Sequence, residues 1–310
     1  MFEKMQKPLF IFEMANNHMG DVDHGIKIIY AFKKVAEKYK NFNFAFKLQL
    51  RNKSIIHPDY QDRMDIKHIK RFTETRLTPE HFKMLLDEMK KCSFISICTP
   101  FDEESVDDMD KLGFDIYKMA SCSFADWPLL ERFGSVNKPM IISTGGSSVA
   151  EMDNVVVFLK HRNKDFCLMH CVTAYPTKAD ELQLNQINFI RNRYEDVPVG
   201  FSTHEVTDAL DPVKIAIGKG AMVFEKHVGV KTEKYALNDY SATPEQTDLW
   251  LKAASDAFEI CGTTGERMLF TEAAQSGVRP YIRGAFVKRK LFIFKQKTAY
   301  EMWRLLSIAP

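Results

Sequence analysis

The sequence predicts an α/β fold, a (β/α)8 TIM barrel in which eight parallel strands close into one sheet. Eight short apolar runs alternate with segments whose apolar residues recur at helical spacing, a pattern typical of parallel strands joined by crossover helices. The length of 310 residues accommodates such a barrel, which needs roughly 250 residues. No glycine-rich nucleotide-binding pattern follows the first run, which disfavours an open doubly wound sheet.

Each apolar run ends in polar residues, as expected of a buried strand that enters a loop at the rim of a barrel. The eight predicted strands are 9–15, 44–50, 94–101, 114–121, 139–146, 166–172, 197–204 and 222–228.

The intervening segments contain recognisable helix starts. Thr78, Pro79 and Glu80 supply an N-cap, a proline at the first helical position and an acid near the positive end of the helix dipole. The same order recurs over residues 243–246, where a glutamine completes a capping box. The connection over residues 51–77 is long and polar, which predicts a loop decorating the rim.

Composition excludes several classes of partner. A formal net charge of +2 without a Lys/Arg run predicts no nucleic-acid partner. No apolar run approaches the ~20 residues that span a bilayer, and the N-terminus lacks a signal-peptide pattern. The six cysteines form no CxxC pair or short disulfide framework, so we expect reduced, mostly buried thiols. These features together predict a cytoplasmic protein without membrane association.

Polar residues at the carboxyl ends of the strands are expected to meet at one rim, where barrels of this class carry their active sites. In strand order they are Glu13, Asn17 and His18; Lys47 and Gln49; Thr99; Lys118, Ser121 and Ser123; Ser143, Thr144, Gly145 and Gly146; His170, Thr173 and Tyr175; Ser202 and His204; Glu225 and His227. Two lysines with several hydroxyls suit a dianionic phosphate. Two histidines on neighbouring strands suit a shared divalent metal. The sequence therefore predicts a phosphorylated substrate beside a metal.

Structural interpretations of the same residues stay open. A histidine after a strand is more often a hydrogen-bonded structural residue, and hydroxyls such as Thr99, Ser121 and Ser143 often cap loops. Lys47 and Lys118 lie inside apolar strands, where an unpaired charge would be costly, so we expect them to be functional or ion-paired. The cysteines at 98, 122, 167 and 171 are most simply small buried hydrophobes.

An ordered series of short motifs runs along the strand ends. The motifs are EMANNHMG at 13–20, KLQ at 47–49, CTPF at 98–101, YKMAS at 117–121, ISTGG at 142–146, HCVTAYP at 170–176, GFSTH at 200–204 and EKH at 225–227. Any one motif alone would be weak. The ordered series, over about residues 9–288, resembles the sialic acid synthases, together with the related synthases of other nine-carbon acidic sugars.

The resemblance implies a transferase that condenses phosphoenolpyruvate with an N-acetylmannosamine-type amino sugar into a nonulosonic acid. Carbon three of phosphoenolpyruvate would attack the open-chain aldehyde, water would add at carbon two, and phosphate would leave by C–O cleavage. His204 and His227 would bind Mn²⁺, or Mg²⁺ or Co²⁺, as a Lewis acid. The residues implied to hold phosphoenolpyruvate are Lys47, Gln49, Thr99, Lys118, Ser121, Ser143, Thr173 and Ser202. Glu13 and Glu225 would position the sugar and the proton transfers, and Tyr175 and Asp239 would contact the sugar.

Two departures from the family pattern stand out. Thr173 occupies a position where better-known members have Asn, which puts that phosphate contact in doubt. The domain prediction is a catalytic barrel over residues 1–280, the start of a linker at 281–290 to an antifreeze-like domain that the chain lacks, and a non-native tail at 291–310. In the family, a domain-swapped homodimer lets an Arg of that domain reach the partner's sugar site. We therefore expect a homodimer of the full-length protein and weak sugar binding by this chain.

Two alternative functions stay open. One is a Schiff-base aldolase with Lys47, Lys118 or Lys226 as the amine nucleophile. The other is a catalytically impaired barrel that only binds a ligand.

Overall fold

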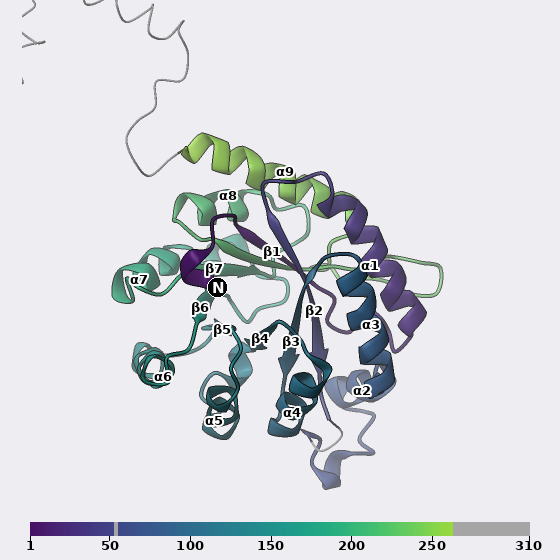
Figure 1. The fold of residues 1–310 in the computed structure, drawn as a ribbon. Helices are drawn as coiled ribbons and strands as arrows, with labels where there is room; N and C mark the ends of the chain where they lie inside the picture. Colours follow the sequence, from purple (N-terminus) through teal and green to yellow (C-terminus); the bar gives the residue numbers. More distant parts are fainter. Residues whose placement is uncertain (53–54, 263–310) are drawn as a thin grey trace, which may run out of the picture. The chain divides into compact units, whose positions relative to one another are not determined.

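Eight parallel strands form a closed barrel in the order β1 to β8 in the computed structural model (Figure 1). The structure describes residues 1–52 and 55–262. The chain divides into two units, Met1–Cys261 and Gly262–Pro310, and the first unit holds the barrel. The predicted domain boundary at residue 280, the linker at 281–290 and the tail at 291–310 lie outside the described residues. The predicted (β/α)8 fold is confirmed.

The strands occupy the same places as the predicted runs, and all except β2 are shorter than predicted. They are β1 (Leu9–Glu13), β2 (Asn43–Leu50), β3 (Ile95–Pro100), β4 (Ile116–Met119), β5 (Met140–Ser143), β6 (Phe166–His170), β7 (Val199–Thr203) and β8 (Val223–His227). Parallel pairing of β1 with β8, in which Glu13 lies opposite His227, closes the barrel. The predicted ends overshoot because their last residues already belong to rim loops, as with Ser121 in a short 3-10 turn, Ser121–Ser123.

Helices surround this barrel and cover its outer face (Figure 1). They are α1 (Val22–Ala36), α2 (Lys67–Glu74), α3 (Pro79–Lys91), α4 (Glu103–Leu112), α5 (Trp127–Ser135), α6 (Val149–His161), α7 (Asn185–Arg193), α8 (Asp211–Gly218) and α9 (Pro244–Cys261). Both predicted helix starts are confirmed. The Thr78 side chain accepts a hydrogen bond from the His81 amide, and Thr243 and Gln246 exchange the two bonds of a capping box at 2.9 and 3.3 Å.

The connection after β2 differs from the prediction of a loop, because it contains α2. This helix has no buried residue and no side-chain cap, so neither an apolar stripe nor a start signal marks it in the sequence. Phe72 of α2 instead packs against the guanidinium of Arg51, which lies 4.1 Å from the Phe72 ring centre and 4.0 Å from that of Phe101. The helix is therefore held by a stacked arginine.

Side chains alternate between two cores, as the period-two geometry of strands requires. One core fills the barrel and includes Leu9, Ile11, Ile97, Ile116, Ile141 and Val223, with Phe2 of the N-terminal turn packed against it. The other lies between the strands and the helices and is rich in aromatic rings, such as Phe10, Phe224 and Trp250. Every second residue of a strand therefore points into the barrel.

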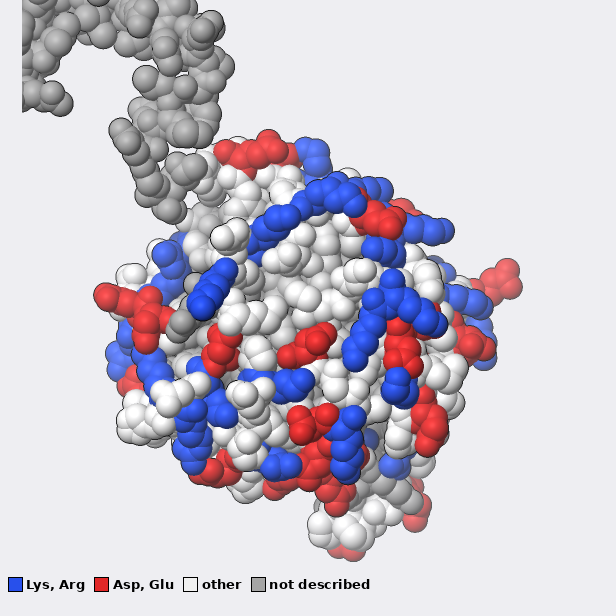
Figure 2. Space-filling view, in the orientation of Figure 1, with Lys and Arg blue, Asp and Glu red and all other residues white. Residues whose placement is uncertain are grey.

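The surface carries charges of both signs, and most of the cysteines are buried. Lysines and arginines are interspersed with acidic residues on the face shown in Figure 2. All six cysteines are free, and four are buried, whereas Cys122 and Cys261 are exposed. The expectation that Cys122 is buried was wrong, because it lies in the rim turn after β4. Across the described residues, none of the helices combines the length and apolarity needed to cross a membrane.

Gly200 in β7 tests how closely the strands approach each other. A Cβ atom there would lie 2.5 Å from the backbone oxygen of Val223 in β8 and 2.9 Å from its Cβ. Because backbone cannot move aside as a flexible side chain can, we expect Gly200→Ala to lower the free energy of unfolding by about 2 kcal/mol, measured by urea denaturation. Gly218→Ala is the control, since its Cβ would meet nothing within 4 Å at the end of a helix. Equal stability of the two variants would contradict this account of the packing.

Candidate active site at the carboxyl ends of the strands

Four charged side chains project into the barrel just beyond its apolar filling: Glu13 of β1, Lys47 of β2, Lys118 of β4 and Glu225 of β8. Lys47 Nζ lies 2.6 Å from Glu13 Oε2 and 2.9 Å from Glu225 Oε1. Lys118 Nζ donates to the other Glu225 oxygen at 3.0 Å. All four are between 0 and 4% exposed, so each charge depends on its partners. We call these four residues the charged cluster.

The cluster fixes the protonation of its members. Burial would raise the pKa of Glu225, but the ammonium groups of Lys118 and Lys47 outweigh it and hold that pKa far below its usual range. Burial lowers the pKa of Lys47 to about 8, although the carboxylate of Glu225 opposes this shift. Glu225 is therefore ionised, and Lys47 is largely charged at neutral pH but loses its proton more readily than an exposed lysine.

Glu13 is close to a charge but poorly hydrogen-bonded. Its ion pair with Lys47 is short, yet the direction of that contact does not meet the geometry of a hydrogen bond, and neither carboxylate oxygen has a hydrogen-bond partner among the described residues. The short distance keeps the two charges balanced, and the missing hydrogen bonds leave the carboxylate available to a ligand. The Glu13 carboxylate is thus free to accept a donor from a bound molecule.

Short polar side chains surround the cluster. Ser202 Oγ donates to Glu225 Oε1 at 3.1 Å. Gln49 lies opposite Thr99 on the next strand, and its side-chain oxygen accepts from Arg51 Nη2 at 2.5 Å. The buried Thr99 hydroxyl has no hydrogen-bond partner in the described part of the chain. A buried hydroxyl without a partner is suited to bind an anionic oxygen of a ligand.

The other predicted substrate-binding residues lie at the same end of the barrel but differ in exposure. Ser143 at the end of β5 is buried, Ser121 is half-buried, and Thr173 and Tyr175 in the loop after β6 are exposed. Asp239 is also exposed and lines a different surface hollow, with Asp208 and Lys231. The structure therefore brings most of the predicted set together and leaves Asp239 outside it.

His204 and His227 are neighbours, with ring centres 5.4 Å apart. His204 Nδ1 lies 2.8 Å from the carbonyl oxygen of Val172, so Nδ1 carries the proton and Nε2 keeps a free lone pair. Burial lowers the pKa of His204 to about 4 and that of His227 well below its ordinary value. Both rings are therefore neutral, the state in which imidazole binds a metal.

Aromatic rings line the approach to these histidines. Tyr175 lies 4.4 Å from His204, Tyr240 lies 5.2 Å from His227, and the two tyrosines are 5.3 Å apart, all between ring centres. The sequence reasoning missed Tyr240, which directly follows Asp239. Its position depends on how the loop after β8 folds back, for which the sequence carries no periodic signal.

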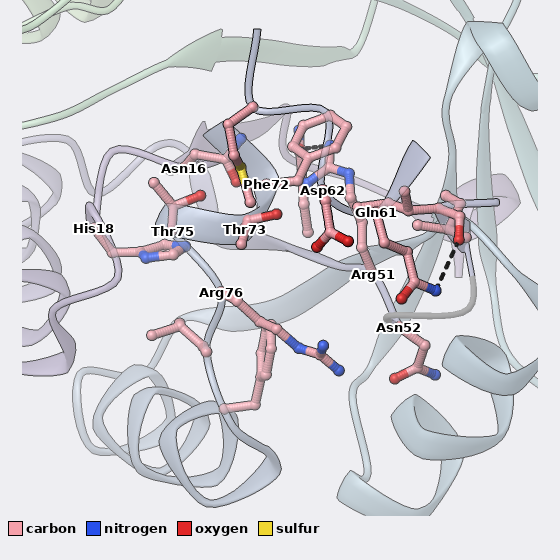
Figure 3. Close-up of a pocket in the computed structure, with 16 residues that line it drawn as sticks. Asn16, His18, Arg51, Asn52, Gln61, Asp62, Phe72, Thr73, Thr75 and Arg76 are labelled. Carbon is pink, nitrogen blue, oxygen red and sulfur yellow. Dashed lines mark hydrogen bonds between the residues drawn. The ribbon is translucent and has the colours of Figure 1, made fainter. Parts of the chain in front are cut away.

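A cavity of about 200 Å³ lies at the carboxyl ends of β1 and β2 (Figure 3). Its lining combines amide and charged groups with an apolar wall, and includes Asn16, His18, Gln49, Arg51, Asn52, Asp62, Phe72 and Arg76. Gln49 belongs to both the cavity and the surroundings of the cluster. His18 Nδ1 accepts from the Gly20 amide at 3.1 Å, and burial lowers its pKa to about 4, so its Nε2–H remains as a donor.

Two rim candidates, His170 and Asn17, and the alternative nucleophile Lys226 have structural positions instead. His170 points outward, and its Nε2 lies 2.9 Å from the carbonyl oxygen of Leu182. Asn17 donates to Val228 O at 2.8 Å and to Ser241 Oγ at 3.0 Å, joining the loops after β1 and β8. Lys226 also faces the outer core, so it cannot act as an amine nucleophile inside the barrel.

Known proteins share both the sequence and the fold. Residues 38–264 match the model of the NeuB family. The N,N'-diacetyllegionaminic acid synthase of Campylobacter jejuni is 31% identical over 230 residues, 72% of this chain and 68% of that protein. The N-acetylneuraminate-9-phosphate synthase of Mus musculus is 28% identical, over 78% of this chain and 67% of that protein.

Two solved structures share the fold of this chain. A spore coat polysaccharide biosynthesis protein E from Chromobacterium violaceum is 49% identical with a TM-score of 0.86, and the match covers 89% of this chain and 82% of that one. An N-acetylneuraminic acid synthetase from Leptospira borgpetersenii has a TM-score of 0.78 over 92% of this chain and 94% of that one. This second protein is 24% identical to the chain, so the match shows a shared fold and no more.

Lys47 tests the charge balance of the cluster. We expect Lys47→Met to lower the free energy of unfolding by about 3–5 kcal/mol, because it leaves the Glu13 carboxylate buried without its ion-pair partner. The double variant Lys47→Met with Glu13→Met should lose less than the sum of the two single changes. Urea denaturation of the three variants measures the coupling.

Lys252→Met is the control, since Lys252 pairs with Asp256 on the exposed face of α9, where such pairs contribute little. Additive losses at Lys47 and Glu13 would show that the two charges do not depend on each other.

Proposed function

The chain belongs to the NeuB family, and we propose from this that it is a phosphoenolpyruvate-dependent synthase. It would condense phosphoenolpyruvate with an N-acetylmannosamine-type amino sugar and release a nonulosonic acid and phosphate. The observation that carries this proposal is the charged cluster, in which two buried ammonium groups share one carboxylate beside two neutral imidazoles.

The cluster supplies donors that suit phosphoenolpyruvate. Each ammonium has three N–H donors. Lys47 Nζ contacts two carboxylates, and Lys118 Nζ contacts Glu225 and the sulfur of Met169, so each keeps a donor for the phosphate or carboxylate of the substrate. The hydroxyls of Thr99, Ser121, Ser143, Thr173 and Ser202, with the amide of Gln49, would complete the binding set.

His204 and His227 fit a divalent metal, with Mn²⁺ the first candidate and Co²⁺ or Mg²⁺ as alternatives. Both rings are neutral, and Nε2 of His204 has a free lone pair. Within the described residues, no group of three or more His, Cys, Asp or Glu is arranged to hold a metal, so the protein would provide these two ligands. A metal held there supplies Lewis-acid polarisation of the sugar aldehyde.

The reaction would form one carbon–carbon bond and one carbon–oxygen bond to water, and it would break the carbon–oxygen bond to phosphate. Carbon three of phosphoenolpyruvate attacks the aldehyde carbon, water adds at carbon two, and phosphate leaves with the bridging oxygen. Glu13, with both carboxylate oxygens free of hydrogen bonds, would accept a proton or orient the sugar. Glu225 would hold Lys47 and Lys118 against the substrate, and Ser202 fixes one of its oxygens.

The acceptor sugar would lie on the solvent side of the cluster. Tyr175 is 51% exposed and packs on His204, which suits contact with a sugar that enters from the rim. Gln49 lines the cavity shown in Figure 3, which offers donors for acyl and hydroxyl groups. The sugar contact of Asp239, a cytoplasmic location and a homodimer of the full-length protein stay predictions.

A Schiff-base aldolase is the second candidate, favoured by the lowered pKa of Lys47. Such an enzyme would form a covalent adduct with its carbonyl substrate that borohydride traps. An untrapped, chelator-sensitive reaction supports the synthase, and binding without turnover supports a barrel that only binds a ligand.

Phosphate release tests the proposal. We expect release from phosphoenolpyruvate only when an N-acetylated amino sugar and Mn²⁺ are both present, measured against a panel of N-acetylated hexosamines. His204→Ala and His227→Ala should each lower the rate by at least about 100-fold and reduce bound metal. His170→Gln is the matched control, a strand-end histidine that faces away from the site. Release that needs no sugar and survives chelation would overturn the proposal.

The titration of Lys47 predicts how the binding of phosphoenolpyruvate depends on pH. Its pKa of about 8 means that the ammonium is present below this pH and is lost above it. The dissociation constant of phosphoenolpyruvate should therefore increase above pH 8, by up to about tenfold per pH unit for one linked proton. Calorimetry between pH 6.5 and 9.5 measures this curve. Lys47→Arg, which keeps its charge over that range, should flatten it, and an unchanged curve would remove Lys47 from the binding set.

A further inference from the structure

Lys226 is a fully buried lysine that points away from the reaction. It stands in β8 between Glu225 and His227, which face the barrel interior, so the alternation of the strand directs it into the outer core. Its Nζ donates to Thr203 Oγ1 at 3.3 Å and to Glu205 Oε1 at 3.4 Å, and lies 5.7 Å from the ring centre of Trp250.

The two acceptors of Lys226 flank one proposed metal ligand. Thr203 precedes His204 and Glu205 follows it, and Thr203 lies directly opposite Lys226 in the pairing of β7 with β8. One ammonium therefore holds both neighbours of His204 from outside the barrel, while its own strand carries His227. The contact joins the two strand ends that carry the imidazoles.

Stability gives little reason for this arrangement. Lys226 and Glu205 are 0 and 2% exposed, and both hydrogen bonds of the ammonium are long. Glu205 Oε2 and Trp250 Nε1 are buried without hydrogen-bond partners in the part of the chain that the structure describes. Apolar side chains of similar size stabilise such a place at least as well as an ion pair. Unlike apolar residues, the ion pair of Lys226 and Glu205 would fix the spacing of the two strand ends.

We propose that Lys226 and Glu205 position the two metal-binding histidines, so that the pair sets metal affinity and site geometry from the outer side of the barrel. The inference rests on the proposed function for the existence of the metal site. It deepens that proposal by assigning residues that touch neither metal nor substrate, and it replaces the nucleophile role considered for Lys226.

The test is a double variant, Lys226→Met with Glu205→Gln, which removes both charges and leaves neither orphaned. We expect a folded protein whose Mn²⁺ dissociation constant rises about 10–100-fold, the range typical of changes behind a metal ligand. The visible absorption of bound Co²⁺ should also change, because it reports ligand geometry. Phosphoenolpyruvate affinity without metal should stay the same, since the charged cluster is intact, and kcat at saturating metal should fall without a change in the KM of phosphoenolpyruvate.

Thr203→Val is the second variant in case the double variant does not fold, since it removes one acceptor of Lys226 and keeps the shape of the side chain. A smaller increase in the Mn²⁺ dissociation constant is expected. The matched control is Ser96→Ala, which removes a partly buried hydrogen bond from the buried Ser96 hydroxyl to Asp115 on the outer side of β3 and should leave Mn²⁺ binding unchanged.

Two outcomes would overturn the inference while the proposed function stands. One is wild-type Mn²⁺ affinity and an unchanged Co²⁺ spectrum in the double variant, or in Thr203→Val if only that variant folds. The other is an equal loss of metal and phosphoenolpyruvate affinity, which would indicate a general disturbance. A wild-type protein that binds neither Mn²⁺ nor Co²⁺ would instead overturn the proposed metal site, and the positioning role with it.

Discussion

The carboxylate of Glu225 is the interaction on which the candidate site depends, because it neutralises two buried lysines at once. Its two oxygens face Lys47 and Lys118, which come from β2 and β4 while Glu225 comes from β8. These strands are not neighbours in the barrel. Three separated strand ends can meet around one carboxylate only because the sheet closes. The closed barrel thus allows the three charges to be buried together, although none of them could be buried alone.

The alternation of side chains along a strand separates the residues that face the candidate site from those that hold the strands together. In β7 and β8, Ser202 and Glu225 face the interior, whereas Thr203 and Lys226 face the helices. The inner residues are available to ligands, and the outer ones hold the strand ends together. A change of one residue in register would exchange the two sets. The short distance between Gly200 and the backbone of Val223 opposes that change, so the packing of this glycine contributes to the chemistry of the residues that follow it.

The sequence was sufficient to predict the features that depend on local periodicity. The eight strands and the inward lysines follow from apolar runs that end in polar residues, which is why Lys47, Lys118 and Glu225 could be placed at one rim. Helix α2 could not be predicted, because it buries no residue and rests on the stacking of Arg51. Tyr240 was missed for a different reason, because its position depends on the fold of the loop after β8. Lys226 is different, because it stands in the strand between two residues predicted at the rim site, Glu225 and His227. The alternation of a strand therefore directs it outward, away from the role of a nucleophile in the barrel.

Charge balance connects the parts of the proposed function. The charged cluster contains two carboxylates and two ammonium groups and is close to neutral, and the imidazoles beside it are neutral as well. Phosphoenolpyruvate brings at least two negative charges into this buried place, which the residues of the cluster alone would not offset. A divalent cation at His204 and His227 would supply the missing charge on the side of the site where the sugar aldehyde is expected. The neutrality of the histidines therefore has two consequences. It frees a lone pair of the imidazole for the metal, and it means that the metal, not the imidazoles, would offset the negative charge of phosphoenolpyruvate.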